Sequence, residues 1–392
     1  MNQPDNQLEK AVILRVVSAL LLAERQIALL ERCRPLGIHA ELERLVADWN
    51  RGRESSARFS YALQPDLNDL IRGLELIAGQ TERFGDEGPW FGARAQELAL
   101  DAELVQAVGT EQFAALAMRR FALPPPLMRE AVDGCVEGFL RITFESSTAP
   151  LHRSNDRADE RSLYSILFRQ LQALGLKASI LVEPQLPTVA ATGIGSISIR
   201  PNDWLSELDA RRIAAHEILG HLLPRENALK AHGILVCAPA CASGDEEGRA
   251  LYIEERLGLM DSARKHELGL RHRACALSRE GAGFVEVVRV LRGLGASVRS
   301  AISVAVRCFR GSGTAGSRAL GSGLGREIIY LPAYLAVRHA FEEIPELEGW
   351  FESGRCSLAY ARHLGASLGE HAPPNAATFR HYLSAISTQT GT

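Results

Sequence analysis

The sequence has no strong excess of charge of either sign and no long uninterrupted apolar run. Its 44 Lys and Arg residues nearly balance 47 Asp and Glu residues, which gives a formal net charge of −3. A charge this small gives no electrostatic reason to expect nucleic acid or an anionic membrane as a partner. The apolar stretch at residues 11–23 is interrupted by Arg15 and is too short to cross a bilayer. We therefore expect no nucleic-acid partner and no membrane partner.

Cysteine is also scarce, with seven residues scattered along the 392 of the chain. An odd number without regular spacing is typical of reduced thiols in the cytoplasm and argues against a disulfide framework. Cys237 and Cys241 are four residues apart and could form a regulatory disulfide or a second metal site, but we interpret them as small apolar side chains. The other residues, 46% hydrophobic and 23% charged, can build a core of ordinary size. We predict a cytoplasmic globular protein.

The first part of the chain has the pattern of a helical region. Apolar residues recur at three- and four-residue spacing, which is the period of an amphipathic helix. Three consecutive prolines at 124–126 end one helix and begin another, because proline fits only the first turn. The expected helices are 8–34, 40–51, 67–80, 93–123 and 126–139.

The pattern changes near residue 145. A helix is expected over 161–174, and three short runs typical of strands follow it at 178–182, 188–192 and 196–199. An exposed edge strand beside a catalytic helix can take a peptide backbone by strand addition, although a supporting hairpin is the plainer interpretation. We expect an α+β protein that is mainly α-helical, with a small β-sheet. The predicted domains are an N-terminal helical region over 1–145 and a second domain over 146–392.

His216, Glu217 and His221 form an H-E-x-x-x-H motif. Two imidazoles can hold a metal ion while the adjacent carboxylate takes a proton from a water molecule, as in zinc peptidases. The usual motif separates its histidines by four residues, whereas a separation of five would turn the two rings about 140° apart on a regular helix. One π-type turn would bring them back to one side, and Gly220 can tolerate that distortion.

A second acidic segment, residues 245–256, has the composition of a helix. We predict Ser243 or Asp245 as its N-cap. A Glu near its start could complete a set of two His and one Glu, which is a ligand set of catalytic zinc. Glu254 lies seven residues after Glu247 on the same helical face, where it could hydrogen-bond to a ligand histidine and orient it. A solvated acidic face would be the interpretation of this segment alone, but the upstream motif favours the ligands.

The two segments together resemble the QEGLA-motif family, whose animal members include the tubulin tyrosine carboxypeptidase that removes a C-terminal tyrosine. That family carries H-E-x-x-x-H followed by the QEGLA box, which corresponds to Glu-Glu-Gly-Arg-Ala at 246–250 here. The resemblance implies that Glu247 is the third zinc ligand. The chain departs from the box with Glu246 in place of Gln and Arg249 in place of Leu, and Arg249 could alter what the site accepts. The resemblance covers about residues 35–365.

The same two segments are also similar to the H-E-L-L-G-H and E-E-C-R-A pair of dipeptidyl peptidase III, a zinc enzyme that removes dipeptides from N-termini. Members of that family are much longer, have a large second lobe and separate the two segments more widely. A chain of 392 residues fits the carboxypeptidase-like family better.

A third block, residues 307–331, resembles the family's Arg-Gly-Gly stretch and the Lys-Asp-x-x-Tyr-Leu box that follows it. Arg326 and Glu327 stand here in place of Lys and Asp. A mobile loop over a cleft suits the glycine content of the block. The glycines lie at positions 311, 313, 316, 321 and 323.

A carboxypeptidase needs a cation that binds the terminal carboxylate of its substrate, and a guanidinium does so through two parallel hydrogen bonds. Arg310 and Arg326 are our candidates for this role, with Arg249 behind them. Tyr330 could donate a hydrogen bond to the oxyanion that develops during the reaction. For each of these four residues, a structural role is the alternative.

These patterns predict a zinc metallopeptidase with a zincin-like core, which makes residues 146–392 the catalytic domain, and the resemblance implies that it is a carboxypeptidase. His216, His221 and Glu247 would hold Zn²⁺ and Glu217 would act as general base. The expected partner is the C-terminal tail of a peptide or protein, and the resemblance implies an aromatic last residue. The alternatives are a dipeptidyl peptidase III-like aminopeptidase, a peptide-maturation protease of a biosynthetic pathway, and a non-enzymatic regulator with a closed four-ligand metal site.

Overall fold

In a computed structural model, the chain folds into two compact units. Unit 1 comprises residues 1–144 and 262–332, and unit 2 comprises residues 145–261 and 333–392. The chain therefore leaves unit 1 near residue 145 and returns to it once. The residues that the structure describes are 3–81, 83–143, 148–231, 233–313 and 323–368.

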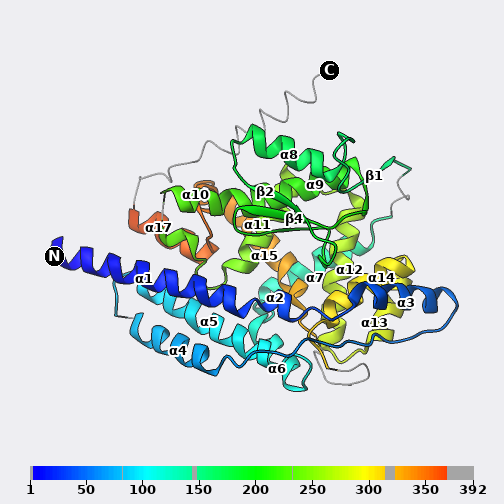
Figure 1. Cartoon of the computed structure of the whole chain (residues 1–392), viewed down its shortest axis with the longest axis horizontal. Helices are drawn as coiled ribbons and strands as arrows, with labels where there is room; N and C mark the ends of the chain where they lie inside the picture. The colour runs from blue at the N-terminus through cyan, green and yellow to red at the C-terminus, as the bar shows by residue number, and fades with distance from the viewer. Residues whose placement is uncertain (1–2, 82, 144–147, 232, 314–322, 369–392) are drawn as a thin grey trace. The chain divides into compact units, whose positions relative to one another are not determined.

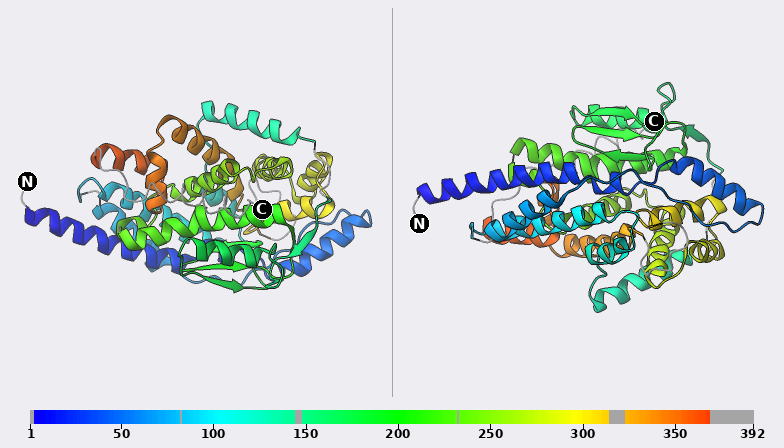
Figure 2. Two further views of the ribbon diagram at one scale, coloured as in Figure 1. Left: turned by 90° about the horizontal axis from the view of Figure 1, so that it is seen from above. Right: turned by 60° about the horizontal axis from the view of Figure 1, so that its bottom comes forward.

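The described part of unit 1 consists of helices and their connections. Figures 1 and 2 show α1, α4 and α5 packed side by side. Among the described residues of the whole chain, every helix is too short or too polar to span a membrane. The elements of unit 1 are α1 (Gln3–Ile27), α2 (Leu29–Arg32), α3 (Ile38–Asn50), α4 (Asn68–Thr81), α5 (Gly88–Gln106), α6 (Gln112–Arg120), α7 (Pro126–Leu140), α12 (Ser262–Arg279), α13 (Phe284–Gly293), α14 (Val298–Phe309) and the 3₁₀-helix η3 (Arg326–Ile329).

The core of unit 1 joins its two chain segments. Val287 and Leu291 of α13 and Ile302 and Ala305 of α14 are fully buried, at the three- and four-residue spacing of an amphipathic helix. α14 also packs against α3, from the first segment. Residues far apart in the sequence therefore exclude water together, which accounts for the return of the chain to this unit.

Two long helices expected from the sequence are broken. In place of a single helix over 93–123, α5 ends before Gly109, which has a left-handed backbone (φ 81°) and donates its N–H to the carbonyl of Gly311. In place of a single helix over 8–34, α1 and α2 meet at Ala28, whose φ is 44°. Alanine favours helices, so no local signal marks the break at Ala28, whereas Gly109 is a residue type that commonly follows a helix end and was overlooked.

Unit 2 contains both sheets of the structure's described part. Its elements are β1 (Leu151–Arg153), α8 (Leu163–Ala173), β2 (Ser179–Val182), β3 (Ala190–Thr192), β4 (Ser196–Ile199), β5 (Trp204–Ser206), α9 (Glu207–Ala215), the π-helix η1 (His216–Leu222), α10 (Leu223–Ala231), the 3₁₀-helix η2 (Gly233–Val236), α11 (Ala242–Arg256), α16 (Leu347–Ser353) and α17 (Leu358–Leu368). Helix α15 (Tyr330–Glu343) begins in unit 1 and continues in unit 2.

The larger sheet has the order β2-β4-β3, with β2 parallel and β3 antiparallel to the central strand β4. Its strands are the three that the sequence predicts. The smaller sheet pairs β1 with β5 in antiparallel orientation and joins Arg153 to Trp204, a pairing that the sequence did not predict. The chain is thus an α+β protein, mainly α-helical, as expected.

The core of unit 2 fixes η1 against the larger sheet. Ile197 and Ile199 alternate with more exposed residues along β4 and are fully buried. They share one apolar cluster with Leu167 of α8 and with Ile218 and Leu222 of η1. Figure 1 shows the sheet beside α8 and α9. The apolar residues within the H-E-x-x-x-H segment therefore hold it on the sheet while its polar residues face elsewhere.

Candidate metal centre

The two histidines of the motif are brought together by the π-helix η1, so the predicted π-type turn is present. Their Nε2 atoms are 3.3 Å apart, although a regular helix would have turned the rings to different sides. Gly220 lets η1 lie against α11, because a Cβ at this position would be 2.6 Å from the Cβ of Ala250. The structure thus shows a packing role for this glycine, and its predicted tolerance of the unusual turn stays a prediction.

Glu247 on α11 completes a cluster of three groups that could hold a metal ion. One ligand atom each from His216, His221 and Glu247 lies within 4.8 Å of the other two. The Nε2 atom of His216 is 3.7 Å from the Oε2 atom of Glu247. Gly248 permits this placement, because a Cβ there would lie 2.5 Å from the carbonyl carbon of Ala333. The glycine and the alanine of the 246–250 box are therefore packing residues, Gly248 against Ala333 and Ala250 against Gly220.

The start of α11 differs from the prediction. The helix begins at Ala242, and its N-cap residue is Cys241, which has a left-handed backbone (φ 65°). Neither Ser243 nor Asp245 caps it. The Asp245 carboxylate instead accepts a hydrogen bond from the backbone N–H of Leu358, at the start of α17. Capping by a distant carboxylate needs the tertiary fold, so composition alone could not reveal it.

Glu254 is fully buried, and its Oε1 atom lies 2.8 Å from the Nδ1 atom of His216. A carboxylate only accepts, so Nδ1 carries the proton and donates it. When the ring is neutral, the lone pair of His216 therefore lies on Nε2, the atom that faces His221 and Glu247. Arg212 lies 3.9 Å from the other oxygen of Glu254 and supports its charge.

We expect Glu254→Gln to weaken binding of a divalent metal ion at this cluster by about 10- to 100-fold, because the amide holds the His216 ring less firmly and makes it a weaker base. Competition of the protein with a chromogenic chelator would measure the affinity. Glu255→Gln is the matched control, since this neighbour on α11 pairs with Arg338, away from the motif. Equal affinities in the two variants would contradict the assigned contact.

The pKa values of the two histidines are shifted in opposite directions. Burial lowers the pKa of His221 to about 3, so its ring is neutral at neutral pH. Burial also acts to lower the pKa of His216, but the carboxylates of Glu247 and Glu254 outweigh it and raise the pKa to about 10. The pocket between these groups therefore favours positive charge, which a proton or a metal cation can supply.

Glu217 is buried beside the histidines, 9% exposed. The hydroxyl of Thr192, at the end of β3, donates to its Oε2 atom at 2.7 Å, and its distance to the Glu217 backbone oxygen is 3.0 Å. Burial raises the pKa of Glu217, while His216 and the hydrogen bond from Thr192 act against the rise. A carboxylate held in this way suits proton transfer near neutral pH. Thr192 was not predicted as a site residue, because only its place in a predicted strand is visible in the sequence.

Both departures from the QEGLA box are buried and have partners. The carboxylate of Glu246 lies 2.9 Å from Nε of Arg355, and both residues are buried. Arg249 is 3% exposed, and its Nη1 atom donates to the backbone oxygens of Leu219 at 2.6 Å and of Gly220 at 3.3 Å. A π-helix leaves carbonyls without their usual partners where it meets an α-helix. Arg249 satisfies two carbonyls inside the motif, and its role as a substrate-binding residue stays a prediction.

We expect Arg249→Met to lower the free energy of unfolding by about 1–3 kcal/mol, because two buried carbonyls lose their donor. The affinity for a divalent metal ion should fall as well, since the turn that joins His216 to His221 would relax. Urea unfolding and chelator competition would measure the two effects. Arg256→Met is the control on the same helix, because the Arg256 guanidinium bonds to the Tyr252 hydroxyl and not to the motif. A variant as stable as the wild type would exclude this role.

The remaining predicted site residues, Arg310, Arg326 and Tyr330, belong to unit 1. The guanidinium of Arg326 lies over the ring of Tyr330, 5.5 Å from its centroid. Arg310 is buried and lies 3.8 Å from the carboxylate of Glu327. Their roles toward substrate stay predictions. Two glycines of the predicted mobile loop, Gly316 and Gly321, lie outside the described residues.

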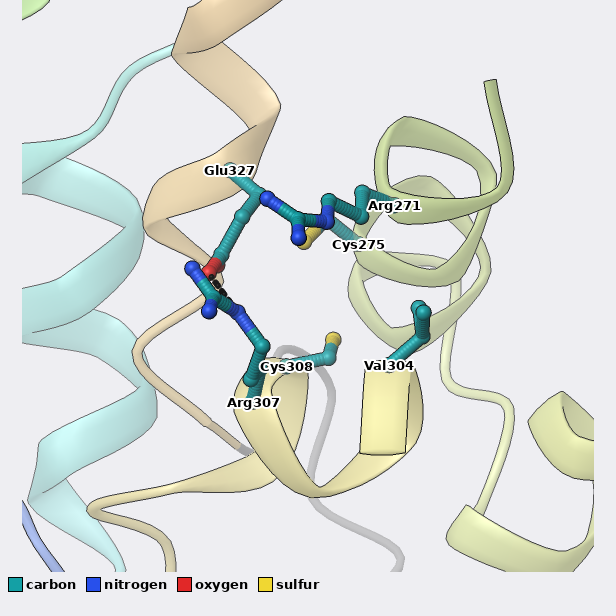
Figure 3. Close-up of a pocket in the computed structure, with 6 residues that line it drawn as sticks. All are labelled: Arg271, Cys275, Val304, Arg307, Cys308 and Glu327. Carbon is teal, nitrogen blue, oxygen red and sulfur yellow. Dashed lines mark hydrogen bonds and ion pairs between the residues drawn. The ribbon is translucent and has the colours of Figure 1, made fainter. Parts of the chain in front are cut away.

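Glu327 is the centre of a buried charge cluster in unit 1. Its carboxylate lies 2.9 Å from Nε of Arg307, and Figure 3 shows the two groups facing each other. Burial acts to raise the pKa of Glu327, but Arg307 and Arg310 outweigh it and lower the pKa to about 2. A shallow depression beside the pair, without room for a water molecule, is lined by Arg271, Cys275, Val304, Arg307, Cys308 and Glu327.

Comparison with known protein families gives one match. A family model described as microtubule-associated tyrosine carboxypeptidase matches residues 50–370. This range contains η1, the 246–250 box and the block at 307–331. A search of curated proteins finds none that matches the chain.

Proposed function

Because the chain belongs to the microtubule-associated tyrosine carboxypeptidase family, we propose that it is a zinc-dependent carboxypeptidase. The observation that carries the proposal is the cluster of His216, His221 and Glu247, with the Glu217 carboxylate next to it in the chain. Two imidazoles, which bind metal in their neutral form, and one carboxylate are a ligand set of catalytic zinc. This set leaves a fourth position open for water.

The spacing of the donors fits this ion. Two ligands on a tetrahedral zinc, with bonds of about 2.1 Å, lie roughly 3.4 Å apart. The distances in the cluster are 3.3 Å between the Nε2 atoms of His216 and His221, and 3.7 Å from His216 Nε2 to Glu247 Oε2. The hydrogen bond from His216 to Glu254 supports the same assignment, because metal-bound histidines commonly donate their second N–H to a carboxylate.

A zinc ion bound by these residues would polarise the scissile carbonyl and make a water molecule acidic. Glu217 would take the proton from that water and later return it to the leaving amine. The Thr192 hydroxyl donates to Oε2 of Glu217 and so orients the carboxylate for both transfers. β3, which carries Thr192, lies at the edge of its sheet, where a substrate backbone could add as a further strand.

We propose the C-terminal tail of a peptide or protein as substrate, with an aromatic last residue. The family description supports a terminal tyrosine, and the scattered cysteines favour a protein of the cytoplasm. Arg310, Arg326 and Tyr330 remain candidates for contacts to this substrate.

The test is incubation of the zinc-loaded protein with peptides that vary at both ends, followed by mass spectrometry of the products. Loss of one C-terminal residue, abolished by chelation and restored by added zinc, is the expected result. Peptides that end in Tyr or Phe should be cut fastest. Release of N-terminal dipeptides, or cleavage that survives full removal of the metal, would contradict the proposal.

A further inference from the structure

Arg225 lies one helical turn after the second histidine of the motif. It follows His221 by four residues on α10, which continues directly from η1, so the two side chains emerge on the same side. Arg225 is half-buried. The sequence did not suggest it as a site residue, although its four-residue spacing from a histidine is visible there.

The hydrogen bonds of Arg225 place its guanidinium where β3 meets the proposed base. Its Nη1 atom donates to the backbone oxygen of Thr192 at 3.2 Å, with Gly193 O at 3.5 Å. Thr192 in turn donates through its side chain to the carboxylate of Glu217. The cation is therefore fixed beside the edge strand and the group that would activate water. A guanidinium carries five N–H donors in a plane, so it can contact a strand and a carboxylate together.

A cation beside Glu217 would favour the binding of a substrate carboxylate at the metal centre. Glu217, which lies beside the proposed metal and is not among its ligands, would repel a substrate that ends in a free carboxylate. Burial acts to raise the pKa of both Glu217 and Glu246, and Arg225 is among the cations that oppose this effect. The positive charge of Arg225 therefore stabilises carboxylates on both η1 and α11.

Three other arginines of unit 2 also contact residues of the centre, but they are held by other partners. Arg355 pairs with Glu246, and Arg212 lies 3.0 Å from the carboxylate of Asp209. Arg249 is bound to the backbone of η1 and is nearly inaccessible. Arg225 combines partial exposure with contacts to the strand that a substrate would join.

We infer that Arg225 binds the free carboxylate of the last substrate residue and thereby restricts the centre to the terminal peptide bond. The inference rests on the proposed carboxypeptidase activity and names the feature of the substrate that is recognised. With the terminal carboxylate of the substrate bound to Arg225 beside β3, the carbonyl of the last peptide bond would lie within reach of Glu217. Internal peptide bonds lack that carboxylate, so they would bind without this contact.

The test compares two peptides of one sequence that end in a free carboxylate or in an amide. Binding is measured by calorimetry on the zinc-loaded full chain with Glu217→Gln, so that turnover does not interfere. We expect the acid to bind more tightly than the amide. Adding Arg225→Gln should weaken binding of the acid by about 10- to 100-fold, the value of a hydrogen-bonded charge, and change the amide by less than about 3-fold.

Two further variants separate recognition from structure. Arg169→Gln is the matched control, because Arg169 is also half-buried and donates to a backbone oxygen, that of Glu160. Its preference for the acid should equal that of the parent. Arg225→Lys keeps the charge but loses the planar fork, so it should reduce the preference by a smaller factor. If Arg225→Gln does not fold or does not hold zinc, Arg225→Lys still tests whether Arg225 recognises the terminal carboxylate.

Equal weakening of acid and amide in Arg225→Gln, or an unchanged preference in Arg225→Lys, would overturn the inference and leave the carboxypeptidase activity standing. The activity itself is judged separately, on the wild type. If the wild type releases no terminal residue, the proposed function fails, whatever the binding of the two peptides.

Discussion

The Glu217→Gln variant is expected to lose nearly all peptide hydrolysis, with kcat lower by about 10²- to 10⁴-fold, the usual contribution of a general base. The amide has almost the shape of the carboxylate but cannot accept a proton from water. Glu217 is not one of the three clustered ligand groups, so zinc should remain bound. The expected result is therefore a folded, metal-loaded and inactive protein.

Single-turnover release of the terminal residue, together with zinc content by atomic absorption, would measure this result. Glu207→Gln is the matched control, because Glu207 pairs with Arg211 at the start of α9, outside the centre. It should retain the kcat of the wild type. Substantial activity in Glu217→Gln would assign the base to another residue, and loss of zinc would mean that Glu217 acts through the metal site.

The Glu327→Gln variant is expected to lower the free energy of unfolding by about 3–5 kcal/mol, because removal of one partner leaves buried charges uncompensated. Glu327 is 3% exposed and lies between Arg307 and Arg310. Its amide could not offset those two cations. Urea unfolding at neutral pH would measure the loss. Glu43→Gln, which breaks an exposed pair with Arg299, is the control and should cost less than about 1 kcal/mol.

The pH dependence of this difference has a definite sign. The pKa of Glu327 falls from 4.5 to about 2 on folding, so its stabilising effect is fully present above pH 4.5 and is lost as the pH falls toward 2. The gap in stability between wild type and Glu327→Gln should therefore narrow across this window. A gap that stays constant down to pH 2.5 would mean that Glu327 is not held ionised by its arginines.

The H-E-x-x-x-H motif shows how far local sequence can determine a site. A spacing of five residues between His216 and His221 is compatible with a shared side only through a π-type turn, so the turn follows from the helical period itself. The same local rules predicted the three strands of the larger sheet. They did not predict the breaks at Ala28 and Gly109, because a loop contact with Gly311 and a left-handed alanine have no periodic signal.

Most contacts around the cluster could not be predicted in the same way. Glu254 was expected to bond to a ligand histidine, and the structure shows that this histidine is His216, 38 residues earlier in the chain. No pattern linked Thr192 to Glu217, which lies 25 residues further along the chain. Arg249 was considered for substrate because an arginine at a leucine position is conspicuous, but only the packing of α11 on η1 reveals its two carbonyl partners. For such long-range pairs, the sequence supplies the chemical groups without their distances.

By itself, the sequence determined the helical character of the chain, the family to which it belongs and the residue types able to bind zinc. These properties depend on composition and short spacings, which are local. The tertiary structure decided that Glu247 lies beside His216 and His221, that Glu254 hydrogen-bonds to His216, and that residues 262–332 return to the first unit. Those outcomes depend on which buried faces exclude water together, a property of the whole folded chain that no short segment contains.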